Sequence, residues 1–112
     1  MNDYIQVVTT TPTSDDAQKI AQALVEQRLA ACVQIAGPIT SVYRWQGKIE
    51  TTQEWQCLIK SRREFYERIE DAIRKLHPYQ VPEILALPIV TGNEAYLRWI
   101  DQEVGTGFKP TL

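Results

Sequence analysis

The chain has 112 residues, of which 44% are hydrophobic and 23% are charged, and its net charge at pH 7 is −2. These values are typical of one globular domain with its own core, and they exclude a disordered tail, a collagen-like chain and a coiled-coil rod. Proteins that bind nucleic acid through its phosphates usually carry a basic surplus, which this chain lacks. We therefore expect a single domain over residues 1–112 and no nucleic-acid partner.

The N-terminus and the apolar segments predict a cytoplasmic protein. Residues 1–4 contain no basic segment that leads into an apolar core, so we expect no secretory signal. Every apolar run is too short to span a bilayer, and we expect no membrane partner. Cys32 and Cys57 do not form a CxxC pair and sit in strand-like runs. We interpret both as packing residues, with a metal-ligand or redox role as the alternative.

The first half of the chain shows strand and helix patterns in turn. A β-branched run ends at Thr11–Pro12, and Thr13 to Asp16 then has the spacing of a helix capping box. Gly37–Pro38 interrupts the next extended run. We expect a strand over 4–10, an amphipathic helix over 14–29, a strand over 31–36 and extended chain over 39–46.

The second half begins with a hairpin turn at Gln46–Gly47–Lys48 and a long return strand to Lys60. Strands this long overhang a domain of this size, and exposed aromatic edges need a cover. We therefore interpret the hairpin, with Trp45 and Trp55, as an oligomer contact. We further expect a helix that starts at a capping box over Ser61–Glu64. A strand over 83–90 should follow, buried on both faces but with an edge or bulge at Pro88. A last helix should be capped by Asn93.

The resulting order, β-α-β-β-α-β followed by a helix, predicts an α+β, ferredoxin-like sandwich with a long β-hairpin and a C-terminal helix. RNA recognition modules share this order, but the run over 52–60 has one aromatic residue, one acid and no basic glycine motif. The sequence also lacks dinucleotide, P-loop and GxSxG motifs. With a single histidine, it shows no catalytic constellation, and we expect no enzyme activity.

The most unusual segment is His77–Glu83, which holds two prolines, an imidazole, a phenol and a carboxylate in seven residues. One interpretation is a helix stop followed by a rigid entry to the next strand. The other is a polar pocket lined by His77, Tyr79 and Glu83 and preorganised by the prolines. Lys60, at the end of the long strand, can add a positive charge to such a pocket.

Five blocks in order carry a family resemblance: Leu29–Val33, Ser41–Glu50, Ile59–Ser61, His77–Ile84 and Tyr96–Ile100. Together they resemble the divalent-cation tolerance protein CutA family over nearly the whole chain. The resemblance implies a ferredoxin-like protomer in a tight homotrimer, similar in architecture to PII signalling proteins. It also implies a link to copper and other divalent metals, with no cofactor required.

The resemblance carries over unevenly to the metal ligands. In copper-binding bacterial members, the proposed ligands are a cysteine near the end of the first strand and two adjacent histidines before the Pro-Tyr pair. Thr9 and Leu76 occupy two of these positions here, and only His77 remains. Thr and Leu cannot replace sulfur or imidazole as copper donors, so the resemblance implies at most weak copper binding at His77.

Three hypotheses follow. The first is a cytoplasmic, homotrimeric protein that binds divalent metal or a small ligand without catalysis. The second is a PII-like sensor that binds a small anionic metabolite in a candidate intersubunit pocket with Lys60, Tyr79, Glu83 and Trp45. The third is a trimeric scaffold without a small ligand.

Overall fold

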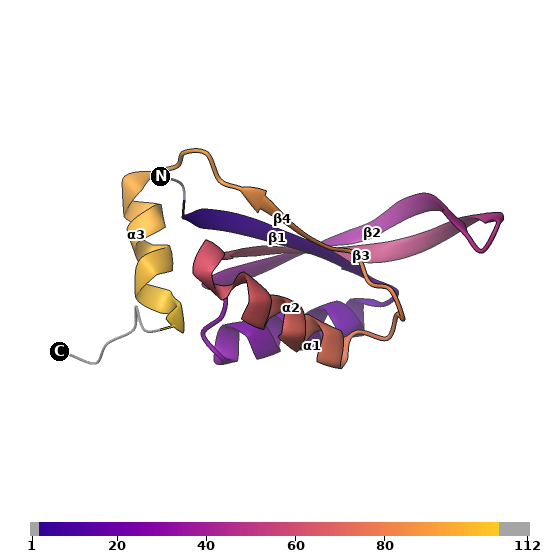
Figure 1. Cartoon of the computed structure of the whole chain (residues 1–112), viewed down its shortest axis with the longest axis horizontal. Helices are drawn as coiled ribbons and strands as arrows, with labels where there is room; N and C mark the ends of the chain where they lie inside the picture. Colours follow the sequence, from indigo (N-terminus) through magenta and orange to yellow (C-terminus); the bar gives the residue numbers. More distant parts are fainter. Residues whose placement is uncertain (1–2, 106–112) are drawn as a thin grey trace.

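The computed structural model describes residues 3–105 (Figure 1). The expected order of elements is confirmed, and a short 3-10 turn, η1, precedes the second helix. The elements are β1 (Tyr4–Thr11), α1 (Ser14–Glu26), β2 (Cys32–Trp45), β3 (Lys48–Arg62), η1 (Arg63–Phe65), α2 (Tyr66–Leu76), β4 (Ile84–Pro88) and α3 (Glu94–Glu103).

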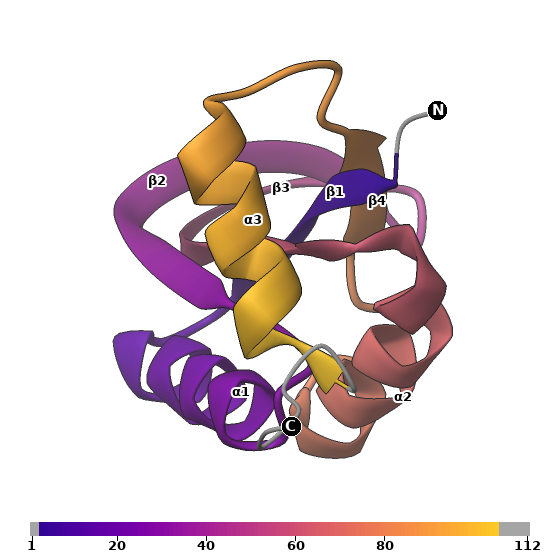
Figure 2. The same cartoon turned by 90° about the vertical axis from the view of Figure 1, so that its left-hand side faces the viewer.

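The four strands form one antiparallel sheet in the order β2-β3-β1-β4. Helices α1 and α2 lie side by side against one face of this sheet, as Figures 1 and 2 show. Helix α3 lies at the end of the sheet opposite the tip of the β2–β3 hairpin (Figure 1). This arrangement confirms the ferredoxin-like sandwich.

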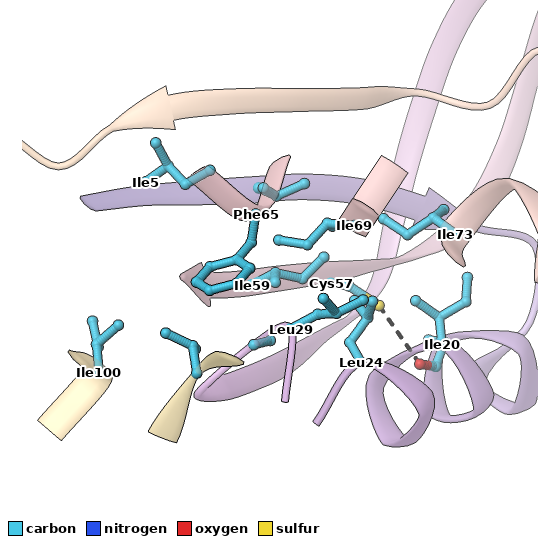
Figure 3. Close-up of a cluster of buried hydrophobic side chains, with 14 residues drawn as sticks. Ile5, Ile20, Leu24, Leu29, Cys57, Ile59, Phe65, Ile69, Ile73 and Ile100 are labelled. Carbon is cyan, nitrogen blue, oxygen red and sulfur yellow. Dashed lines mark hydrogen bonds between the residues drawn. The ribbon is translucent and has the colours of Figure 1, made fainter. Parts of the chain in front are cut away.

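The hydrophobic core fills the space between the sheet and the two helices (Figure 3). Ile20 and Leu24 of α1 and Ile69 and Ile73 of α2 are fully buried against the strands. Each such side chain contributes about 1.5–3 kcal/mol through burial of apolar surface. Cys57 of β3 is also fully buried, which confirms its predicted packing role.

Two of the predicted helix caps are confirmed. The Asp16 backbone N–H donates to the Thr13 hydroxyl at 3.0 Å, and the Tyr96 N–H donates to the Asn93 side chain at 2.9 Å. Helix α1 ends at Glu26 rather than at residue 29, because Arg28 adopts a left-handed backbone conformation with φ of 58°.

The predicted capping box at Ser61 is wrong. Ser61 belongs to β3, where it pairs with Ile5, and its buried hydroxyl donates to the Leu29 carbonyl at 2.6 Å. Pairing with β1 extends β3 to Arg62, so α2 begins only at Tyr66 and has no side-chain cap. A hydroxyl that is buried needs a partner, and here the partner comes from a distant segment.

The long hairpin is confirmed. Its strands have 14 and 15 residues, and the turn places Gln46 and Gly47 at φ of 52° and 80°. Such positive values at two adjacent positions suit a tight hairpin turn. The pairing shifts between Ala36 and Ile39, where the sequence predicted an interruption. Beyond this shift the hairpin extends past the rest of the sheet (Figure 1).

The prediction that the strand over 83–90 is buried on both faces is wrong. β4 spans only Ile84–Pro88 and forms an outer edge of the sheet, with Leu85 and Leu87 exposed. Leu85 and Leu87 therefore face outward from this protomer, whereas Ile84 packs against the core. The expected edge at Pro88 is confirmed, because β4 is an outer strand and ends at this residue. A proline has no backbone N–H to donate, and an edge strand tolerates this loss.

Candidate functional site

His77 links the end of α2 to the end of β1. Its backbone N–H donates to the Ile73 carbonyl at 2.8 Å, and the chain then turns to the extended conformation before Pro78. The imidazole Nδ1 accepts from the Tyr79 N–H at 3.1 Å, so Nε2 carries the ring proton. Nε2 donates to the Thr10 carbonyl at 2.7 Å. Both ring nitrogens are therefore engaged within the fold.

Tyr79 connects the loop after α2 to the base of the hairpin. Its hydroxyl donates to Glu54 Oε2 at 2.8 Å, and its ring lies 5.0 Å from the His77 ring. Burial raises the pKa of Tyr79, and the hydrogen bond to Glu54 and the nearby negative charges raise it further. The phenol thus keeps its proton and acts as a donor. Glu54 is buried at 6% exposure, although it is a carboxylate in a strand.

A pocket of about 550 Å³ opens beside this pair. Three of the predicted site residues line it: Trp45 from the hairpin, and Tyr79 and Glu83 from the loop. His77 and Lys60 do not line it, which corrects the prediction for both. The His77 ring is held by Thr10 and the Tyr79 N–H, and the Lys60 ammonium group donates to Gln34 at 2.7 Å. The predicted set is therefore brought together only in part.

Sequence reasoning missed Glu54 as a site residue, along with Tyr43, which also lines the pocket. Glu54 lies on the parity opposite to Trp55, which the alternating pattern marks as the polar side of a strand. The signal available in the sequence was a carboxylate in the long strand, near the point where the strand leaves the core and continues into the overhanging hairpin. In the folded chain, the loop that carries Tyr79 brings a hydrogen-bond partner to this carboxylate and allows it to be buried.

The positions of the family's metal ligands have different environments here. Thr9 is fully buried, and its hydroxyl has no hydrogen-bond partner among the described residues. Leu76 is exposed at 44%. Cys57 is buried, and burial raises the pKa of its thiol to about 11. Within residues 3–105, no group of three or more His, Cys, Asp or Glu side chains is placed to hold a metal ion.

The protein-family comparison matches residues 5–103 to a family described as "CutA1 divalent ion tolerance protein". A divalent-cation tolerance protein CutA from Thermus thermophilus is 46% identical over 99 residues, which cover 88% of this chain and 96% of that protein. Human protein CutA is 45% identical over 93 residues, which cover 83% of this chain. The match spans only 52% of the human protein, about half its length.

Solved structures show the same similarity. The divalent cation tolerance protein from Thermus thermophilus matches with a TM-score of 0.89 at 45% identity, covering 91% of this chain and 99% of that one. CutA1 from Oryza sativa matches with a TM-score of 0.90 at 36% identity, covering 93% and 95%. In addition, no helix in the described part of the chain is long and apolar enough to cross a membrane.

Proposed function

This chain belongs to the CutA1 divalent ion tolerance family, and on that premise we propose that it contributes to divalent-cation tolerance as a homotrimeric binding protein without catalytic activity. Its location in the cytoplasm is part of the same proposal. A related structure from Archaeoglobus fulgidus is described as periplasmic, so the compartment needs its own test by fractionation.

The observation that supports assembly is exposed apolar surface along the β2–β3 hairpin and along the outer strand β4. On the hairpin side, Val42 and Ile49 are 66% and 68% exposed, and on β4 Leu85 is 55% exposed. Outer strands also present unpaired backbone groups, which favour pairing with another chain. Because β2 and β4 are different edges, pairing one with the other is head-to-tail and can close into a ring.

Sedimentation of the parent protein and two matched variants tests this assembly. Leu85→Glu places a charge on the β4 edge and should yield monomers. Val25→Glu places the same charge on an exposed position of α1, away from both edges, and should leave the trimer intact. Obligate interfaces commonly bury more than about 2,000 Å², and a trimer held by such interfaces should stay assembled at micromolar concentration. A parent protein that sediments as a monomer at this concentration contradicts the proposal.

The metal-binding part of the proposal is weak copper binding at His77. The imidazole already makes two hydrogen bonds, so a bound ion has to replace one of them. This competition supports weak rather than tight binding. Calorimetry with Cu²⁺ should show weak binding that His77→Ala removes while the fold and the assembly are retained. Tight binding that survives His77→Ala contradicts a site at His77.

A further inference from the structure

The pocket beside Glu54 and Tyr79 has a lining that fits a positively charged ligand. It carries two carboxylates, Glu54 and Glu83, and the described residues that line it include no Lys, Arg or His. Lys48 lies opposite Trp45 across the hairpin turn and is not part of the lining. An anionic metabolite in this pocket would meet like charges without a basic partner. The charge of the lining therefore favours a cation.

Within this lining, the Glu54 carboxylate is the group placed to accept a hydrogen bond from a cationic ligand. Its side chain lines the pocket although the residue is more than nine-tenths buried. Oε2 accepts from the Tyr79 hydroxyl, whereas Oε1 has no hydrogen-bond partner in the described part of the chain. Oε1 is not among the fully buried unpartnered side-chain atoms of the described residues, so it is open to a ligand that supplies a donor. An ammonium group supplies such a donor together with the compensating charge.

Aromatic side chains make up much of the rest of the wall. Tyr43 and Trp45 come from the hairpin, and Tyr79 comes from the loop. The faces of such rings attract organic cations, and Trp does so most strongly. A bare metal ion gains nothing comparable, because it prefers several oxygen ligands and water. The volume of about 550 Å³ is also within the range of small-molecule sites.

We propose that this pocket binds a small organic cation with a protonated primary amine, which donates to Glu54 Oε1 and lies against the aromatic wall. All of the described lining residues come from one protomer, and Tyr43 and Trp45 lie on the hairpin that we propose as an assembly contact, so the inference rests on an assembly that leaves the pocket open. The inference goes beyond the proposed role in divalent-cation tolerance and does not depend on copper binding at His77.

Calorimetry on the intact protein tests the proposal with three probes: 1,4-diaminobutane, succinate and Mg²⁺. The diamine should bind saturably below about 10 mM, whereas succinate, which has the same chain length and the opposite charge, should not bind. Mg²⁺ at equal concentration should not displace the diamine beyond the effect of ionic strength. Saturable succinate binding, or equal competition by Mg²⁺, overturns the proposal, and so does the absence of diamine binding.

Variants assign the binding to the pocket. Glu54→Gln can still accept from Tyr79 but loses the charge, and we expect at least about tenfold weaker diamine binding. Glu67→Gln makes the same change in net charge on the exposed surface of α2 and should leave affinity unchanged. Tyr43→Leu is a second variant, which keeps the proposal testable if Glu54→Gln proves unstable. It changes a partly exposed aromatic residue of the wall and should weaken diamine binding about threefold or more. Equal affinities for all four proteins contradict the assignment.

Discussion

The hydrogen bonds of His77 give a prediction that separates a structural role from a metal-binding one. His77→Ala removes the donor to the Thr10 carbonyl and the acceptor for the Tyr79 N–H. Thr10 is 5% exposed, so its carbonyl loses a partner in a buried place, at a cost of about 1–3 kcal/mol. The Tyr79 N–H is only part-buried and can find water, which limits its cost to about 1 kcal/mol.

The expected loss is therefore about 2–4 kcal/mol in the free energy of unfolding, without any metal present. Urea titration at one fixed protein concentration measures it, because the assembly proposed above would make stability depend on concentration. His77→Asn can keep the acceptor near the Nδ1 position, and His77→Gln can keep the donor near the Nε2 position. Both should therefore lose less than His77→Ala.

The graded order of the three variants tests the hydrogen bonds themselves. A His77→Ala variant within about 0.5 kcal/mol of the parent would show that the two hydrogen bonds contribute little net stability. Equal losses for the Ala, Asn and Gln variants would show that the cost comes from packing of the ring rather than from its nitrogens. Either result would refute a structural role for the ring nitrogens of His77.

Three further predictions concern stability. Thr13→Ala should cost about 1 kcal/mol in a thermal or urea melt, because the Asp16 N–H loses its cap. The free energy of unfolding should fall as pH rises from 9 to 11, since the thiol of Cys57 ionises in the unfolded chain at its ordinary pKa of 9.0 but in the folded chain only near its raised pKa of about 11. Cys57→Ala should have a flatter profile in pH-dependent urea titrations. Gly105→Ala should destabilise by about 1–3 kcal/mol in the same melts, because a Cβ there meets the Phe65 ring at a φ of +48°.

Local signals predicted the parts of the fold that depend on neighbouring residues. The caps at Thr13 and Asn93 and the turn at Gln46–Gly47 each rest on a few adjacent positions, and each is confirmed. The failures depend on distant segments. Ser61 has the spacing of a cap, but Leu29 supplies a carbonyl and β1 supplies a pairing strand, so the residue stays extended.

The candidate site was predictable only where one segment carried it. Tyr79 and Glu83 stood out because they share a short proline-rich loop, and Trp45 stood out on a long hairpin. Glu54 was missed because its partner is 25 residues away and pairing register alone does not reveal the contact. Lys60 was included because it ends the predicted long strand, yet its place in the sheet directs it to Gln34.

The outer hairpin also bears on how this protein folds. Within residues 3–105, residues 39–45 and 48–54 pair only with each other, since β1 meets β3 no farther out than Trp55. An isolated two-stranded ribbon is marginally stable in water and opens and closes within about 1–10 μs. We therefore expect this ribbon to be a separate local unfolding unit in a newly made protomer, with amides that exchange with solvent far faster than those of β1. In the assembly proposed above, a neighbouring chain would supply the missing third strand, and assembly would be the last folding step.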